Sequence, residues 1–137
     1  MPPTTLPPEW LAAIIEQTAE AVIFIDTDGR IRIWNAACTS VFGYPAEEAL
    51  GQSVDLIIPE RFRRAHWEAF DRAVANGRTR GGASVRTTRS MHKDGHKIYL
   101  EISFSLVTGD NGVVIGSVAV GRDCTEKFLA SKGEAGA

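Results

Sequence analysis

Apolar and polar residues along the chain follow patterns that predict two strands, then helices, then three further strands. Residues 21–26 and 30–34 are rich in β-branched and aromatic side chains and flank a Thr-Asp-Gly segment typical of a tight hairpin. Residues 79–92, 97–107 and 113–123 have the same character and are joined by Asp-Gly and Asn-Gly turns. Along residues 98–106 apolar and polar side chains alternate, so one face of that strand should meet the core.

The segments between these strands predict helices. Asn35 is placed to cap a short helix that ends at Gly43, and a second short helix over residues 46–50 should end at Gly51. The longest helical pattern runs from Glu60 to Asn76 and stops at Gly77, and residues 10–18 form a shorter amphipathic segment near the start of the chain.

One face of the long helix is apolar and includes a histidine. Phe62, Ala69, Phe70 and Ala73 share this face, and His66 lies four residues after Phe62 and four before Phe70. His66 should therefore point toward the interior. The order of elements predicts an α+β domain in which a five-stranded antiparallel sheet carries short helices and one longer helix on one face, with a pocket between sheet and long helix.

Composition narrows the class of protein. The 137 residues suit one domain, and fifteen Lys and Arg against seventeen Asp and Glu give a net charge of −2, so neither a nucleic-acid partner nor a membrane partner is expected. Apolar runs are too short to span a bilayer, and two cysteines with no signal peptide favour a cytoplasmic location. Common catalytic motifs are absent, so we do not expect an enzyme.

Four segments in order resemble the PAS sensor domain. They are IDTDGRIRIWNAAC, FGYPAEEALGQSV, MHKDGHKIYLEISFS and the final GRDCTE, and the first and third contain the Asp-Gly and Lys-Asp-Gly turns. The resemblance covers roughly residues 12–127. We accordingly divide the chain into a proline-rich leader (1–8), a flanking helix (9–19), a PAS domain (20–127) and a frayed tail or start of an output linker (128–137).

The segment IIPERFRRAHWEAFDRAVANGRTR resembles the matching helix of haem-binding PAS oxygen sensors. That resemblance implies haem b bound through His66 as the iron ligand, with Arg86 as the distal hydrogen-bond donor to dioxygen. It also implies an apolar distal lining and cations at the haem propionates; these residues are Ile102 and Phe104 for the lining and Arg72 and Arg80 for the propionates.

Other interpretations of these residues stay open. His66 could be a core histidine, and Arg86 could lie on a solvated face or pair across strands with Glu101. Cys38 is not in the flavin-adduct motif of light-sensing relatives and is expected to be a small core residue. His92 and His96 flank a turn, which favours solvent exposure over metal binding.

The function we expect is a sensor of dioxygen or another diatomic gas that passes its signal to a partner or effector domain. A homodimer is expected. The alternatives are a haem-free PAS dimerisation module and a flavin-binding redox sensor. The haem-free module would associate through residues 10–18 and the outer sheet face, with its pocket filled by side chains or an apolar metabolite.

Overall fold

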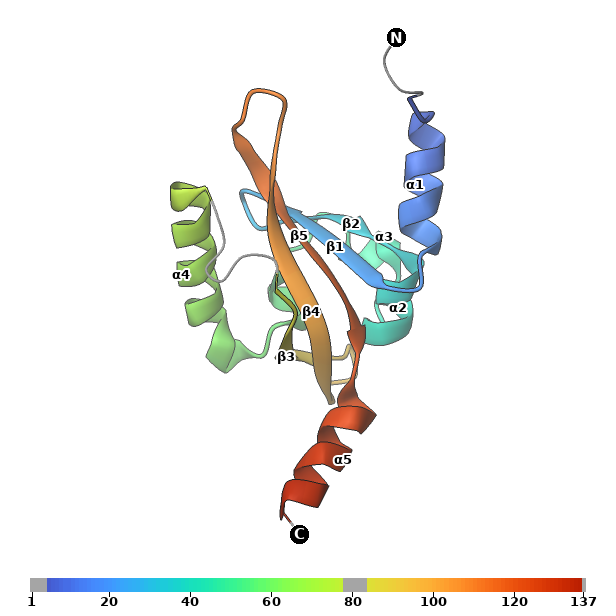
Figure 1. Cartoon of the computed structure of the whole chain (residues 1–137), viewed down its shortest axis with the longest axis vertical. Coiled ribbons are helices and arrows are strands. Elements are labelled where there is room, and N and C mark those ends of the chain that lie inside the picture. Colours follow the sequence, from blue (N-terminus) through green and yellow to red (C-terminus); the bar gives the residue numbers. More distant parts are fainter. Residues whose placement is uncertain (1–4, 78–83, 137) are drawn as a thin grey trace.

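The computed structural model, which describes residues 5–77 and 84–136, is built on one antiparallel sheet of five strands (Figure 1). The strands lie in the order β2-β1-β5-β4-β3. Their bounds are β1 (Ala21–Asp26), β2 (Ile31–Trp34), β3 (Arg86–Met91), β4 (Lys97–Thr108) and β5 (Val114–Asp123). The predicted α+β class and five-stranded sheet are confirmed.

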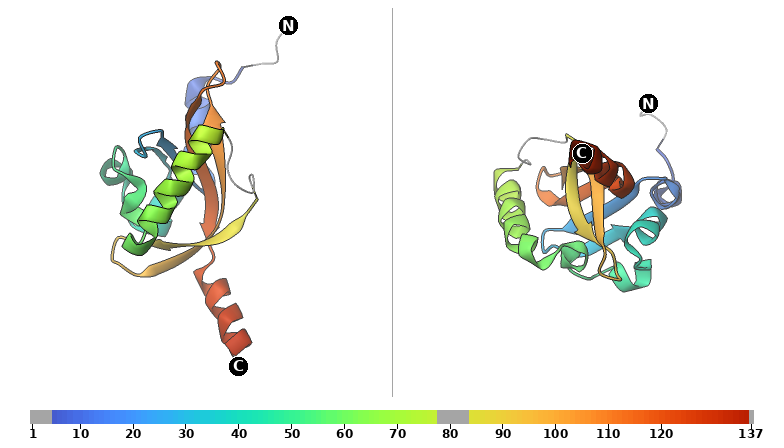
Figure 2. Two further views of the ribbon diagram at one scale, coloured as in Figure 1. Left: turned by 90° about the vertical axis from the view of Figure 1, so that its left-hand side faces the viewer. Right: turned by 90° about the horizontal axis from the view of Figure 1, so that it is seen from below.

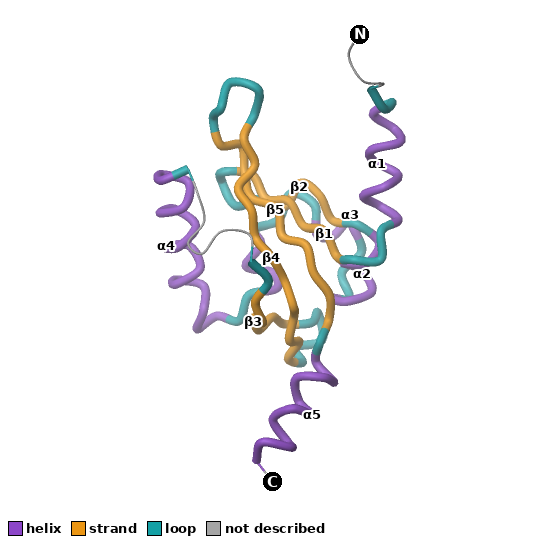
Figure 3. The backbone as a smooth tube through the Cα atoms, in the orientation of Figure 1, coloured by secondary structure: helices purple, strands orange, loops and turns teal. Residues whose placement is uncertain are grey.

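Helices cover one face of this sheet and extend from both ends of the domain. They are α1 (Pro8–Gln17), α2 (Ala36–Phe42), α3 (Ala46–Ala49), the 3₁₀ helix η1 (Val54–Ile57), α4 (Glu60–Asn76) and α5 (Thr125–Gly136). Side chains of α2, α3, η1 and α4 share one core cluster with side chains of the strands. Figure 2 shows α4 standing in front of the sheet, and Figure 3 shows α1 and α5 leaving the body at opposite ends.

The inner face of the sheet can be followed from its register. Ile98, Leu100 and Ile102 of β4 are buried, and their partners on β3 are Ser90, Thr88 and Arg86. The Ser90 hydroxyl donates to the carbonyl of Ile57 in η1 at 2.6 Å, which fixes that face of β3 against the helical layer. Partners across an antiparallel ladder share a face, so Arg86 lies on the inner face with Ile102.

The Asn35 side chain connects three elements, whereas the sequence predicted only that it caps α2. Its Oδ1 accepts from the backbone N–H groups of Cys38 and Val22, and its Nδ2 donates to the carbonyls of Ile15 and Glu20. The side chain is only 1% exposed. Because a buried amide must have its donors and acceptors paired, Asn35 fixes the end of α1 and the start of β1 against α2.

The predicted helix ends are confirmed at Gly43 and Gly77. Both adopt positive φ angles, +85° and +74°, and both donate a backbone N–H to the last turn of the helix they close. This left-handed conformation is one that glycine adopts without steric cost.

The start of one strand differs from the expectation. The third strand was expected from residue 79 and begins at Arg86; Ser84 and Val85 are not in a strand, and residues 79–83 lie outside the described residues. The segment expected to be a frayed tail or the start of an output linker forms part of α5, which runs to Gly136. Asp123 Oδ1 accepts from Thr125 N at 2.8 Å and so caps the first turn of this helix.

None of the helices in the described part of the chain combines the length and the apolar character needed to cross a membrane.

Candidate functional site

The N-terminal half of α4 is fixed by polar contacts to η1. Trp67 Nε1 donates to Asp55 Oδ1 at 2.7 Å, and the Arg63 guanidinium donates to the carbonyls of Ile58 and Asp55 at 3.0 and 3.3 Å. The indole of Trp67 also lies against the backbone of Gly29 in the β1–β2 turn. These contacts orient the turn of α4 that carries His66.

The inner face of α4 differs slightly from the predicted one. It consists of Arg63, His66, Trp67, Phe70, Ala73 and Val74, and of these only Phe70 is fully buried. Two residues expected on that face, Phe62 and Ala69, are exposed, since the contacts of Trp67 rotate the helix away from them. A helix of seventeen residues that buries one side chain is covered incompletely by the sheet.

His66 lies half-buried on this inner face among aromatic rings. Its ring meets Trp67 edge-on with centroids 4.6 Å apart and stacks on Phe70 at 6.4 Å. Its Nδ1 is buried and is without a hydrogen-bond partner in the described part of the structure. Burial lowers the pKa of His66, and the carboxylate of Asp55 raises it by a smaller amount. The imidazole is therefore neutral at pH 7, with a lone pair available to a metal.

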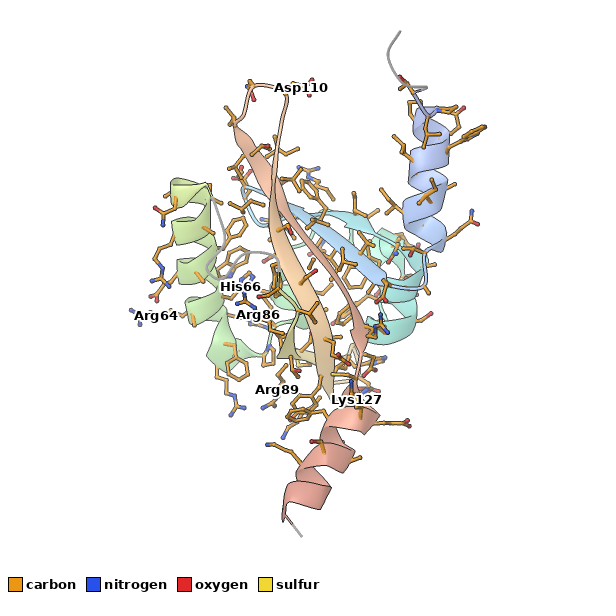
Figure 4. The ribbon with its side chains drawn as sticks, in the orientation of Figure 1. Arg64, His66, Arg86, Arg89, Asp110 and Lys127 are labelled. Carbon is orange, nitrogen blue, oxygen red and sulfur yellow. The ribbon has the colours of Figure 1, made fainter. Side chains whose placement is uncertain are left out.

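The sheet face opposite α4 carries three of the predicted site residues. Arg86 pairs with Ile102 in the β3–β4 ladder, Ile102 is buried, and Phe104 is half-buried on the same face two residues along β4. In Figure 4, His66 extends from α4 toward the sheet and Arg86 lies on the same side of the molecule. The register thus puts Arg86, Ile102 and Phe104 on the sheet face that α4 covers, and Arg86 is exposed there, in agreement with the solvated-face interpretation.

The cross-strand pair between Arg86 and Glu101 considered from the sequence is wrong. Thr87 is the residue opposite Glu101, and Glu101 lies on the outer face, where Lys127 Nζ of α5 contacts its Oε1 at 3.3 Å. The sequence could not show this, because shifting the register by one residue moves every side chain of a strand to the other face.

Of the two arginines expected at the haem propionates, only Arg72 lies within the described residues. Arg72 is exposed on α4 six residues beyond His66, which turns it about 120° around the helix from the histidine. Arg80 lies outside the described residues.

Cys38 is a buried core residue, as predicted. It is fully buried in α2, and its Sγ donates to the carbonyl of Val22 at 3.3 Å. Burial raises the pKa of this thiol to about 11. A protonated thiol inside the core is a poor nucleophile, so Cys38 is unsuited to forming a covalent adduct with a cofactor.

Sequence reasoning missed one cluster and one hollow. His92, Asp94 and His96, assigned from the sequence to a solvated turn, are close enough together to share a metal ion, and His92 is half-buried. Their spacing at positions i, i+2 and i+4 could have indicated a metal site, but only if the conformation of the turn had been known. A hollow of about 530 Å³ lies between the end of α1 and α2, far along the chain from His66.

The residues around His66 fit a haem group. A neutral, half-buried imidazole with an unpaired ring nitrogen is a suitable iron ligand, and Ile102 and Phe104 provide apolar surface across from it. Arg86 adds a cation on that same sheet face.

The sequence of this chain is similar, at low identity, to those of known sensor proteins. Oxygen sensor protein DosP of Escherichia coli is 28% identical over 99 residues, which cover 72% of this chain and 12% of DosP. Sensor protein FixL of Bradyrhizobium diazoefficiens is 28% identical over 121 residues, covering 85% of this chain and 23% of FixL. The chain thus spans less than a quarter of either protein.

Solved structures share the fold. The PAS domain of a Colwellia psychrerythraea protein superposes with a TM-score of 0.74 at 26% identity, covering 86% of this chain and 97% of that one. An RNA-binding light-oxygen-voltage receptor superposes with a TM-score of 0.73, also at 26% identity, covering 93% of this chain and 38% of that one. The family model described as the PAS fold matches residues 9–124. With this match and the five-stranded sheet, the chain belongs to the PAS family.

Proposed function

We propose that this PAS domain binds haem b through His66 and senses dioxygen or another diatomic gas. The observation that carries the proposal is the state of His66: a half-buried neutral imidazole, with an unpaired ring nitrogen, on a helix face that the sheet covers incompletely. Leaving a buried polar atom unpaired costs about 1–3 kcal/mol, a cost that binding a ligand can remove. The likeness of residues 57–80 to the matching helix of haem-binding oxygen sensors supports the same assignment.

The remaining residues divide between the two sides of the site. Ile102 and Phe104 exclude water from the distal side, and Arg86 donates to a ligand that carries partial negative charge. Arg72 and Arg80 are proposed for the propionates. The haem iron, when bound, supplies an open coordination position for the gas.

The signal would leave through the sheet. Ile102 and Phe104 belong to β4, which pairs along its length with β5, and β5 leads directly into α5. A ligand shifts a two-state element only through contacts that differ between the states, and Arg86 is the residue placed to make them. The receiver of the signal is an effector domain or partner protein, as expected for a family found in longer sensor proteins.

An absorption spectrum tests the cofactor. The protein is purified from cells supplied with a haem precursor, and spectra are recorded oxidised, reduced, and reduced under carbon monoxide. We expect a stoichiometric Soret band that shifts with carbon monoxide. His66→Ala should lose haem while retaining its circular dichroism, whereas His96→Ala, on an exposed turn, should keep both. Unchanged haem content in His66→Ala would refute the ligand assignment.

Gas titration tests Arg86. Arg86→Ala should keep full haem content and lower the affinity for dioxygen about tenfold, as expected for loss of one charge-assisted hydrogen bond. Arg122→Ala is the matched control, because Arg122 lies opposite Glu101 in the β4–β5 ladder and shares the outer face with it. An equal loss of affinity in both variants would contradict the role of Arg86.

A flavin-binding sensor is the second candidate, favoured by the similarity to a light-oxygen-voltage receptor. The same purification distinguishes the two, since a flavoprotein is yellow and releases a flavin on denaturation. The buried, protonated Cys38 argues against an adduct-forming photochemistry at that residue. A colourless, folded protein that also fails to take up added haemin would leave a cofactor-free interaction module.

A further inference from the structure

The turn between β3 and β4 brings together three side chains that can bind a metal ion. His92 follows the last residue of β3, His96 precedes the first residue of β4, and Asp94 lies between them in the turn. Each offers one ligand atom, and these atoms all lie within 4.8 Å of one another. The three residues are separate from the proposed haem site, which lies between α4 and the inner face of the sheet.

The two imidazoles face the same carboxylate oxygen. His96 Nδ1 lies 2.5 Å from Asp94 Oδ1, and His92 Nδ1 lies 3.3 Å from it. Two ligand atoms bonded to zinc at about 2.0–2.1 Å in tetrahedral geometry are about 3.3 Å apart. The His92–Asp94 pair already has this spacing, and the His96–Asp94 pair would have to open by about 0.8 Å to reach it.

The three side chains offer donor atoms of the kind a divalent metal ion binds. Asp94 is a carboxylate at pH 7, and the two histidines offer ring nitrogens. His92 Nδ1 accepts from the backbone N–H of Asp94 at 3.1 Å, so this ring nitrogen carries a lone pair, and metal binding would replace that hydrogen bond. Two imidazoles and a carboxylate form a donor set suited to zinc and its neighbours and poorly suited to magnesium, which prefers oxygen alone.

The turn itself is held in place by the helical layer. The backbone N–H of Lys93 donates to the carbonyl of Phe42 at 2.8 Å, and Lys93 Nζ lies 2.7 Å from a Glu48 carboxylate oxygen. The His92 ring packs on Gly43, where a Cβ atom would be 2.5 Å from its Cε1. His92 is thus a fixed ligand. His96 is exposed, and its ring, now stacked on His92 with centroids 4.4 Å apart, can tilt to meet the ion.

From this arrangement we propose that His92, Asp94 and His96 form a surface binding site for one divalent transition-metal ion of the zinc type, with water completing the coordination. The ion would join the end of β3 to the start of β4. Because the donor atoms meet only when the hairpin is formed, the ion binds the folded chain and stabilises it.

Titration of the untagged protein with zinc chloride, followed by calorimetry and by thermal unfolding, tests the site. We expect one zinc ion per chain and a Tm that rises with free zinc, with no comparable effect of magnesium chloride. In long-range ¹H–¹⁵N spectra the ring nitrogens of His92 and His96 should shift on zinc addition, while those of His66, the third histidine of the chain, should not.

Two exposed residues provide variants that preserve the fold. His96→Ala and Asp94→Asn should each weaken zinc binding about tenfold or more, at least the cost of losing a group hydrogen-bonded to a metal ligand. The amide introduced by Asp94→Asn keeps an acceptor oxygen for the backbone N–H of His96, so only the charge is lost. Asp110→Asn, the same change in the β4–β5 turn, is the matched control and should bind zinc as the wild type does.

Failure of the zinc-site proposal can be distinguished from failure of the haem proposal. His66→Gln should retain zinc affinity whatever its haem content. Wild-type zinc affinity in both His96→Ala and Asp94→Asn, or failure of the wild-type chain to bind one equivalent saturably, would overturn the proposal.

Discussion

At Gly29 the β1–β2 turn passes against the indole of Trp67. Gly29 has a φ of +78°, and a Cβ atom built there would overlap Trp67 Cη2. Gly29→Ala should therefore impose both a strained backbone, about 1–2 kcal/mol, and an overpacked contact, about 1–3 kcal/mol. Chemical denaturation should show a loss of stability equal to the sum of the two.

Gly77 supplies the matched control for this prediction. Its φ is +74°, nearly the same, and nothing lies within 4 Å of the position its Cβ would take. Gly77→Ala should show the backbone cost alone. Equal losses in the two variants would mean that the contact with Trp67 gives way without cost.

His66 makes stability depend on pH in a definite direction. Burial lowers the pKa of His66 in the folded protein below its ordinary value of 6.5, so between these two values the unfolded chain binds more protons. Stability should be unaffected by this group above pH 7 and should fall as pH drops below about 6.5. The effect belongs to cofactor-free protein, in which the ring nitrogens are free to titrate.

Urea unfolding of cofactor-free wild type and His66→Gln between about pH 5 and pH 8 measures this dependence. Glutamine has no titrating ring, so the variant should lose less stability than the wild type on acidification, with other groups contributing equally to both. If the two curves run parallel through this range, His66 does not titrate differently in the folded and unfolded states.

Among the elements, α5 is attached to the sheet by one aromatic contact and a few polar ones. Phe128 stacks on Tyr99 of β4 with centroids 4.1 Å apart, and Tyr99 N donates to Thr125 Oγ1 at 3.0 Å. Phe128→Ala should release the helix from the outer face, with α5 amides exchanging faster while those of β4 and β5 keep their protection.

The neighbouring residue tests whether this effect is local. Leu129 is 53% exposed on the same helix, so Leu129→Ala should leave amide exchange in α5 nearly unchanged. Faster exchange of similar size in both variants would indicate that helix propensity, rather than docking on Tyr99, determines the order of α5.

Sequence features within each segment predicted most helices and strands. Contacts between residues distant in sequence determine the orientation of these elements, which those features did not predict. Gly43 and Gly77 mark helix ends by their own conformation, so their positions could be predicted from the sequence. The orientation of α4 could not, because it depends on Trp67 meeting Asp55 and Gly29, which are distant in sequence. A periodic pattern alone could not separate Phe62 from Trp67 as the inner residue.

The same limit applies to the two candidate sites. His66 was found from its helical spacing, because its own helix sets its face. The placement of Arg86 opposite Ile102 required the strand register, and the meeting of His92 with His96 required the shape of the turn. Neither register nor turn conformation is encoded by local periodicity.

For the whole molecule, the exposed apolar face of α1 predicts association of two chains. Trp10, Leu11 and Ile14 are each about half exposed or more, and no residue of α1 is buried within the domain. Contiguous exposed apolar side chains on a helix are typical of an interface. We expect a homodimer that Ile14→Ser weakens toward monomer.

Analytical ultracentrifugation over a range of concentrations measures this equilibrium. Glu9→Ser, a change on the same helix that removes no apolar surface, should dimerise as the wild type does. A wild-type chain that sediments as a monomer at every concentration would contradict the expected dimer.

Only Cys124 separates the last residue of β5 from the first residue of α5. Cys124 is buried, and its backbone N–H donates to the carbonyl of Tyr99 at 2.8 Å. The connection between β5 and α5 is therefore short and held in place. We therefore expect a small rotation of β5 about its axis to displace α5 as well, by an amount that grows with distance along the helix. A displacement of a fraction of an ångström beside Phe104 would swing the far end of α5 farther, which makes its outer end the most sensitive place for a distance probe.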